Sequence, residues 1–202
     1  VSTDLLRQQY ETLTADIRID SCKIGLIGFA ETAELLAELL NDTTFPLVFD
    51  PVLAAGGGSD LAGERLEDNI RRLLVPMTML ITPNLPEAQR LTNRQSHDDC
   101  AAELIQNGCA NVLITGGHED GDMVINRLYD QQGQVGEWHW PRLPGGYHGT
   151  GCTLPSAVAA LLAKGVELQP AVEQAQRFTQ QALLPAATLG RGQLILRRIN
   201  RY

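Results

Sequence analysis

The sequence predicts an α/β protein with a mainly parallel central sheet and helices on both faces. Short apolar runs of strand length alternate with helical patterns, the order expected when crossover helices join parallel strands. Polar and acidic side chains follow several of the apolar runs, where the carboxyl ends of parallel strands would meet. A glycine-rich turn at residues 147–151 opens an apolar helical stretch. With 202 residues, the chain fits one domain, 1–202, with a sizeable core.

Composition and charge exclude several classes of function. The net charge is −8 and the pI is near 4.9, with no stripe of Lys and Arg, so a nucleic-acid surface is not expected. The chain has no signal peptide and no apolar run of about eighteen residues, which predicts a cytoplasmic protein without a membrane span. Neither the cysteines nor the histidines have disulfide-framework or zinc-site spacing, so reduced thiols are the default. The basic tail, 197–201, is expected to be a solvated end.

The first third of the chain predicts two strands and two helices. Residues 4–14 read as a polar helix and residues 23–28 as a buried strand, in which Leu26 would be a core residue. The next helix ends at Asn41 and has apolar residues at helical spacing: Leu35, Leu36, Leu39 and Leu40.

A second strand is predicted at residues 45–52, and it carries an acid near its end. Asp50 would face a crevice at the sheet's edge, or it would only end the strand and cap the turn. The glycine-rich loop 54–59 lacks the spacing and the lysine of a P-loop, so we expect a mobile rim there.

The middle of the chain places an amide and a carboxylate after another strand. A helix over 60–75 is stopped by Pro76, and its inward residues are Leu66, Ile70, Leu73 and Leu74. The following strand, 78–82, leads to Asn84 and Glu87, which a helical turn would put on one face. Oxygen ligands of this kind suit hydrated magnesium. The alternative is a helix N-cap with its capping-box partner.

A further helix, a strand and a hairpin follow. Ser96 opens the helix and Gly108 closes it, with Cys100 and Cys109 as small core residues. The strand 111–115 ends in two glycines, which would let a phosphate approach the backbone. Residues 124–129 and 134–140 form a hairpin that has Trp138 and Trp140 on one face and His139, as a structural residue, on the other.

The glycine-rich turn predicts an anion-binding site. A helix that starts near Gly151 leaves the N–H groups of residues 149–154 without intrahelical partners, at the positive end of the helix dipole. The same position would lower the pKa of the Cys152 thiol. The alternative is an ordinary loop that enters a core helix. The presence of two glycines, a hydroxyl and a thiol at one helix N-terminus favours the anion-binding site.

The helices on either side of Gly165 are expected to be buried. Pro155 would lie in the first turn of the glycine-loop helix, and residues 157–163 would be packed on all faces until Gly165 stops the helix. A last helix would pack back through Val172, Ala175, Phe178, Ala182 and Leu183.

The stretch His-Gly-Thr-Gly-Cys-Thr-Leu, 148–154, resembles the fingerprint of the ribokinase-like small-molecule kinases. Most of them carry an aspartate where this chain has Cys152, which indicates the hydroxymethylpyrimidine and phosphomethylpyrimidine kinases of thiamin synthesis. Three more stretches match in the family's order: 23–28, resembling Lys-Ile-Gly-Met-Leu-Gly; the Asp-Pro-Val at 50–52; and the Asn-x-x-Glu motif within 82–88. The resemblance covers residues 5–192.

This resemblance implies a ribokinase-like fold and phosphorylation, by MgATP, of 4-amino-5-hydroxymethyl-2-methylpyrimidine and then of its monophosphate. ATP and Mg²⁺ would be the cofactors, with Asp50 and Glu87 at the metal. The implied catalytic residues are Cys152, Gly151, Thr150 and Gly149. The implied nucleotide-binding residues are Asn84, Glu87, Thr115, Gly117 and His118, and many relatives carry a lysine where Thr115 stands. Leu26, Val52 and Cys152 would contact the pyrimidine, and the loop 188–192 would lie beside the adenine.

Other functions remain open at this point. The chain starts at Val1 without the family's glycine-rich opening stretch, so we expect that an N-terminal segment, which would supply part of the pocket and its lid, is missing. One alternative is a related vitamin kinase that acts on pyridoxal or hydroxyethylthiazole. Another is a fragment that binds nucleotide without turnover. The expected partner is a small pyrimidine, with no nucleic acid or membrane, and a homodimer is left open.

Overall fold

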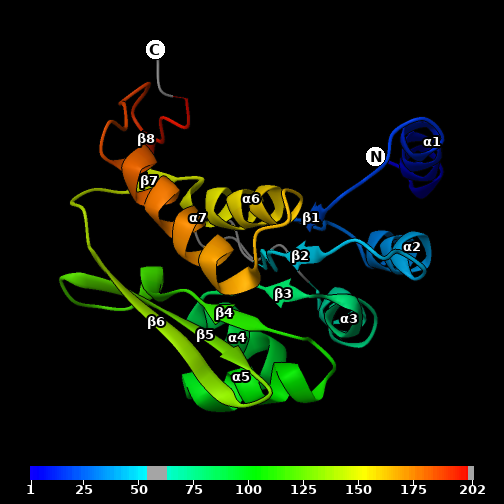
Figure 1. Cartoon of the computed structure of the whole chain (residues 1–202), viewed down its shortest axis with the longest axis horizontal. Coiled ribbons are helices and arrows are strands. Elements are labelled where there is room, and N and C mark those ends of the chain that lie inside the picture. The colour runs from blue at the N-terminus through cyan, green and yellow to red at the C-terminus, as the bar shows by residue number, and fades with distance from the viewer. Residues whose placement is uncertain (54–62, 200–202) are drawn as a thin grey trace.

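The computed structural model describes residues 1–53 and 63–199, in which helices cover both faces of a central sheet (Figure 1). Within these ranges the sheet has six strands in chain order. The first four are parallel: β1 (Cys22–Ile24), β2 (Leu47–Phe49), β3 (Leu80–Ile81) and β4 (Val112–Ile114). The hairpin of β5 (Met123–Asp130) and β6 (Gly133–Pro141) extends the sheet as antiparallel strands. The expected mainly parallel sheet is confirmed.

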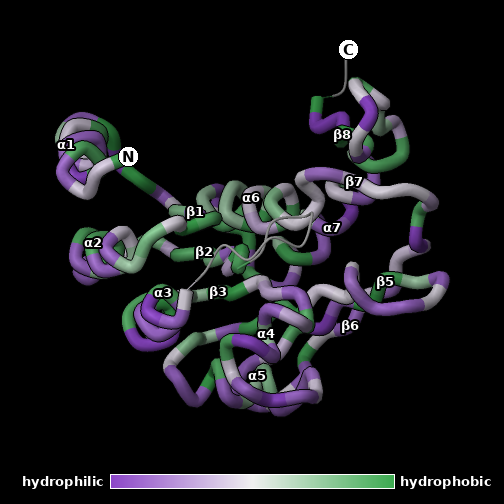
Figure 2. Tube along the Cα trace, turned by 180° about the vertical axis from the view of Figure 1, so that it is seen from behind, coloured by the Kyte–Doolittle hydropathy of each residue, from purple (hydrophilic) through white to green (hydrophobic). Residues whose placement is uncertain are grey.

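The side chains of the strands alternate between two hydrophobic clusters, one on each face. On β2, Leu47 and Phe49 belong to the first cluster and Val48 to the second. The first cluster is covered by α2 (Ala30–Leu40), α3 (Glu64–Asn69), α4 (Leu85–Thr92) and α5 (His97–Gln106). The second is covered by α6 (Thr150–Leu162) and α7 (Leu168–Leu183). Figure 2 shows the apolar strands between these helical layers.

Local sequence signals mark several helix ends. Asn41 is the C-cap of α2, and the Ser96 hydroxyl accepts a hydrogen bond from Asp99 N at the start of α5, as predicted. Gly108 and Gly165 follow α5 and α6 with φ angles of 100° and 78°, which glycine adopts without strain. The polar helix α1 (Thr3–Thr14) has no buried residue and lies beside α2 (Figure 1).

The segment before β3 is more irregular than predicted. The expected helix at 60–75 begins outside the described residues, at 60–62, and α3 is followed by a π-helical turn, η1 (Ile70–Leu74), and a 3₁₀ turn, η2 (Val75–Met77). Pro76 therefore lies inside the last turn rather than after it. Leu66, Ile70 and Leu74 are buried and Leu73 is partly buried. The glycine-rich loop 54–59, expected as a mobile rim, also lies outside the described residues.

Three burial predictions were wrong. Leu26 is 58% exposed because β1 ends two residues before it. Phe178 is 40% exposed because the buried stripe of α7 passes through Gln176 and Thr179 and leaves Phe178 beside it. Helix α6 is not packed on all faces, since Ala160 and Ala163 are exposed.

The glycine-loop helix starts one residue earlier than expected, at Thr150, and this moves Pro155 into its second turn. Within the part of the chain that the structure describes, a second, two-stranded sheet also forms. It pairs β7 (Tyr147–His148) with β8 (Leu194–Ile195) in parallel and was not predicted. No described helix is both long and apolar enough to cross a membrane.

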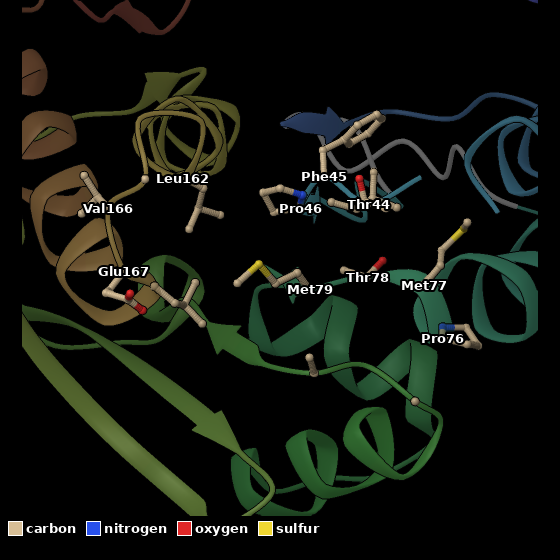
Figure 3. A pocket seen from close by; sticks show the side chains of 15 residues that line it. Thr44, Phe45, Pro46, Pro76, Met77, Thr78, Met79, Leu162, Val166 and Glu167 are labelled. Carbon is tan, nitrogen blue, oxygen red and sulfur yellow. The ribbon is translucent and has the colours of Figure 1, made fainter. Parts of the chain in front are cut away.

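A hollow of about 560 Å³ opens at the amino ends of the parallel strands (Figure 3). It is lined by residues 44–47 before β2, residues 76–79 before β3, and the connection between α6 and α7. Ligands of open parallel sheets bind at the opposite, carboxyl ends of the strands. We therefore place the candidate site at the carboxyl ends.

Candidate functional site at the carboxyl ends of the strands

Four chain segments meet at the carboxyl ends of the parallel strands. Asp50 follows β2, Glu87 lies in the first turn of α4 after β3, and the 3₁₀ turn η3 (Gly116–His118) follows β4. The N-terminus of α6, with Cys152 in its first turn, adjoins the first two segments, because Asp50 interacts with both the Cys152 thiol and the Glu87 carboxylate. The topology thus collects side chains that lie about 100 residues apart in the sequence.

Asp50 is the centre of this group. Its carboxylate is 5% exposed and accepts a hydrogen bond from Lys23 Nζ at 2.9 Å, which makes a largely buried ion pair. The lysine reaches it along β1 across Gly25, whose missing side chain leaves room for Nζ. Asp50 also interacts electrostatically with the Cys152 thiol and with the Glu87 carboxylate. Asp50 is therefore tied to a neighbouring strand by its ion pair with Lys23, which is more than the end of a strand requires, and its role at a binding site stays a prediction.

The Cys152 thiol is held in its protonated form. Cys152 as a whole residue is exposed, yet partial desolvation of its sulfur and the adjacent charge of Asp50 raise the pKa of the thiol, and the cations Lys23 and Arg198 oppose this only in part. The expected lowering of this pKa at a helix N-terminus is therefore wrong, because desolvation and the neighbouring carboxylate raise the pKa. The neutral thiol can donate its proton to Asp50.

The glycine turn forms a compact array of backbone donors. Gly149 has a φ angle of 88°, a left-handed conformation that favours glycine, and it is the N-cap of α6. Thr153 N already donates to Gly149 O at 3.0 Å, so the predicted range of free donors, 149–154, is too wide. Among the described residues, the N–H groups of Thr150, Gly151 and Cys152 precede this first intrahelical bond and stay available to an anion.

Asn84 and Glu87 form the capping box of α4. Glu87 N donates to Asn84 Oδ1 at 2.9 Å, and Asn84 N donates to Glu87 Oε2 at 3.0 Å. The alternative prediction for this pair, a helix N-cap with its capping-box partner, is therefore correct. It does not exclude binding, because burial, with a smaller effect of the Asp50 charge, raises the pKa of Glu87 to about 7.

The two acids Asp50 and Glu87 fit magnesium in a particular way. No cluster of three or more His, Cys, Asp or Glu side chains that could hold a metal occurs in the described ranges. Two neighbouring carboxylates instead suit a Mg²⁺ ion that keeps its waters and the oxygens of a bound phosphate chain. The donor set therefore fits magnesium carried in with a nucleotide and does not form an all-protein cage.

We expect that Glu87→Gln flattens the dependence of stability on pH. With a pKa near 7 in the folded chain and an ordinary value of 4.5, Glu87 binds more proton when folded between these pH values, so stability falls as pH rises through this window. Glutamine does not titrate, yet its amide oxygen can still accept from Asn84. Thermal unfolding of both proteins at pH 5 and pH 8 measures this. Equal dependence of stability on pH in the two proteins would contradict this prediction.

The Glu87→Gln variant should also need more magnesium for activity. An unchanged dependence on magnesium would show that Glu87 is a helix cap only.

The turn after β4 is fixed from two sides. Gly116 N donates to Asn126 Oδ1 at 3.1 Å, and a Cβ at Gly116 would lie 2.4 Å from Ile125 O, so only glycine fits. From the end of β6, Arg142 donates to the carbonyls of Gly117 at 2.9 Å and Gly121 at 2.7 Å, and it also reaches those of Gly116 and Glu119. Arg142 was not predicted, because nothing in its local sequence marks it.

If ATP is the substrate, as the sequence resemblance implies, replacing Arg142 by alanine should raise the KM for ATP about tenfold with a smaller effect on kcat. The substitution frees the turn at Gly117, and one or two hydrogen bonds that order a binding loop correspond to about 1.4 kcal/mol, a factor of ten. Steady-state kinetics at saturating acceptor give both constants. An unchanged KM would show that the turn does not depend on Arg142 or does not bind the nucleotide. Arg177→Ala, on the exposed face of α7, is the control.

The remaining predicted residues lie around this group. Leu26 is exposed in the connection from β1 to α2, and Val52 is half-buried just after Asp50. Gly117 and His118 are exposed, and Thr115 is half-buried, paired through a β-bridge with Asn84. Of the loop 188–192, Leu189 is 78% exposed. Asp50 interacts electrostatically with both Glu87 and Cys152, and Asn84 is hydrogen-bonded to Glu87.

Two further cations of the site were missed or undervalued. Lys23 lies inside the matching stretch 23–28 but was not singled out, although it neutralises Asp50. Arg198 belongs to the tail that was expected to be solvated, and this expectation is wrong for it, since its guanidinium hydrogen-bonds to Thr153 and Gly149. Residues 200 and 201 of that tail lie outside the described ranges.

A mainly parallel sheet with helices on both faces, and with a glycine-capped helix N-terminus near acids at the carboxyl ends of the strands, is typical of small-molecule kinases with the ribokinase-like fold, and solved structures of such kinases share this fold. The particular family follows from comparison with known proteins. The family model "Phosphomethylpyrimidine kinase" matches residues 1–197, and the chain belongs to this family.

Individual relatives agree with this assignment. The hydroxymethylpyrimidine/phosphomethylpyrimidine kinase of Haemophilus influenzae is 36% identical over 197 residues, which are 93% of this chain and 73% of that protein. Among solved structures, an ADP complex of Bacillus subtilis pyridoxal kinase has a TM-score of 0.89 at 29% identity, covering 98% of this chain and 77% of that one. Phosphomethylpyrimidine kinase from Clostridium difficile has a TM-score of 0.77 at 29% identity, covering 91% and 77%.

Proposed function

We propose that this chain transfers the γ-phosphoryl group of MgATP to the hydroxymethyl oxygen of 4-amino-5-hydroxymethyl-2-methylpyrimidine, and then transfers a second one to the resulting monophosphate. The observation that carries the proposal is the meeting of the α6 donor turn with the Asp50–Cys152 pair at the strand ends. Membership of the phosphomethylpyrimidine kinase family supports the acceptor, and the ADP complex of a structural relative supports the nucleotide.

The chemistry follows from the geometry of this site. Phosphoryl transfer depends mainly on positioning and on charge neutralisation. The N–H groups of Thr150, Gly151 and Cys152 would hold the transferring group. Meanwhile the bond from the γ-phosphorus to the oxygen that bridges the β- and γ-phosphates breaks, and the bond from this phosphorus to the acceptor oxygen forms. Bound Mg²⁺ would neutralise phosphate charge, with Asp50 and Glu87 holding it through water and Asn84 beside them.

The proton of the acceptor hydroxyl needs a destination. The raised pKa keeps the Cys152 thiol protonated, so it can take that proton only as its own passes to the neighbouring carboxylate of Asp50. Lys23 keeps Asp50 paired on its other side. Leu26 and Val52 would contact the pyrimidine ring, while Thr115, Gly117 and His118 would lie along the nucleotide.

A panel of acceptors tests this assignment. The chain is incubated with MgATP and each of the pyrimidine alcohol, its monophosphate, pyridoxal and hydroxyethylthiazole, and kcat/KM is compared by product mass. We expect the two pyrimidines to be preferred. The rival with a specific observation in its favour is pyridoxal, because the TM-score to a pyridoxal kinase is 0.89. A higher kcat/KM for pyridoxal than for both pyrimidines would replace the proposed substrate.

Cys152→Asp should slow the second phosphorylation more than the first. The new carboxylate would stand next to Asp50 and to a phosphomonoester with nearly two negative charges, which adds repulsion of about 1 kcal/mol or more. Cys152→Ala carries no charge and should slow both steps together. The ratio of the two kcat/KM values in each variant measures the effect. Equal losses in both steps for Cys152→Asp would show that the size of the cysteine side chain matters at this position and its lack of charge does not.

A further inference from the structure

The C-terminal segment is built into the glycine turn. β8 pairs in parallel with β7, the strand that leads directly into Gly149, with Tyr147 opposite Leu194 and His148 opposite Ile195. Leu196, the next residue, is 5% exposed and anchors the segment. Arg198 is thereby carried to the start of α6, which is more than 40 residues away in the sequence.

The guanidinium of Arg198 closes a hydrogen-bonded ring around the carbonyl of Gly149. Nε donates to Thr153 Oγ1 at 2.8 Å, and Nη2 lies 3.4 Å from Gly149 O. The Thr153 hydroxyl itself donates to Gly149 O at 2.6 Å. A Cβ at Gly149 would lie 2.5 Å from Nη2, so the guanidinium lies directly against this glycine.

This placement of a cation is electrostatically unusual. Positive side chains are favoured at helix C-termini, whereas Arg198 lies at the positive N-terminal end of α6. An anion held between the cation and the helix end removes the conflict. A planar fork of donors is also better suited than an ammonium group to span two acceptors at once, here a carbonyl and a hydroxyl.

We propose that Arg198 is a positioning residue for phosphoryl transfer. By holding Gly149 in its left-handed conformation, it aims the N–H groups of Thr150, Gly151 and Cys152 at the transferring phosphoryl group. This role rests on the proposed kinase function of the same site. It assigns a catalytic contribution to the C-terminal segment, where the sequence shows only a short basic run.

Three variants test the role. Arg198→Gln removes the fork, Arg198→Lys keeps the charge without the fork, and Arg197→Gln is the matched control, because the Arg197 side chain is exposed and has no hydrogen bond or ion pair with the described residues. We expect Arg198→Gln to lower kcat about 100-fold, the order found for loss of one transition-state donor, with the KM for ATP within about threefold. Arg198→Lys should recover less than about tenfold of this loss, since lysine cannot bridge Gly149 and Thr153.

The outcomes separate this role from its alternatives. A kcat for Arg198→Gln within about threefold of the Arg197→Gln value would overturn the proposal, as would near-complete recovery in Arg198→Lys. A lower melting temperature without a loss of kcat would show a structural role only, and it would also overturn it.

If the unaltered chain has no kinase turnover, the proposed function fails, and calorimetry with inorganic phosphate then decides about Arg198. Weaker phosphate binding by Arg198→Gln than by Arg197→Gln would then support only the ordering of the anion-binding turn by Arg198, while the role in phosphoryl transfer would fail together with the proposed function. Equal binding would contradict the ordering as well.

Discussion

Replacing Gly151 by proline should lower kcat by about 10²–10³-fold. Gly151 is the second residue of α6, and its N–H is one of the three donors that the helix leaves available to the transferring phosphoryl group. Proline removes this N–H, and the loss of one such donor typically costs about 2.7–4 kcal/mol of transition-state stabilisation. Turnover of the pyrimidine alcohol under saturating MgATP measures the effect.

Gly151→Ala is the matched control for this experiment. A Cβ at Gly151 meets no atom within 4 Å, so alanine keeps the N–H and adds only a methyl group in open space. Proline also disfavours the helical conformation of Thr150, and thermal melting of both variants shows whether α6 still forms. A folded Gly151→Pro protein with the turnover of Gly151→Ala would refute the assignment of the donor turn.

Replacing Lys23 by methionine should destabilise the fold by about 3–5 kcal/mol. The substitution leaves the Asp50 carboxylate buried without its cation, and removal of one partner of a buried ion pair has a cost of this order. For a chain of about 200 residues this corresponds to a fall in Tm of roughly 6–20 °C.

The double variant Lys23→Met with Asp50→Asn serves as the control for the ion pair. Because asparagine removes the uncompensated charge, the double variant should be more stable than Lys23→Met alone, and a double-mutant cycle measures the coupling. Additive effects of the two substitutions would show that the pair contributes nothing beyond its separate side chains.

The fold was predictable from the sequence because its signals are local. The run Leu47-Val48-Phe49 is apolar at every position, as required for a strand buried on both faces, and Asn84 and Glu87 have the spacing of a capping box. The error at Phe178 has a long-range cause. Gln176 is buried because Asn126 Nδ2 and Trp140 Nε1, both from the hairpin, donate to its Oε1, and no pattern within α7 shows this.

The roles of the predicted site residues stay predictions, but the nearness of three of them at the strand ends could be foreseen better than their electrostatics. Motif positions named Asp50, Glu87 and Cys152, and the structure joins them. The pKa of Cys152 could not be predicted from its place at a helix mouth, since it depends on burial and on a carboxylate that is 102 positions away in the sequence. Arg142 and Arg198 act through backbone carbonyls, which leave no trace in a sequence pattern.

The most direct test of the proposed function is a time course of the reaction products by mass spectrometry, starting from the pyrimidine alcohol and MgATP. We expect the monophosphate to rise first and the diphosphate to follow, with both products retained in Gly151→Ala and both strongly reduced in Gly151→Pro. If calorimetry shows that the chain binds ATP while neither product appears under saturating magnesium, the chain binds nucleotide without turnover, and the proposed function is contradicted.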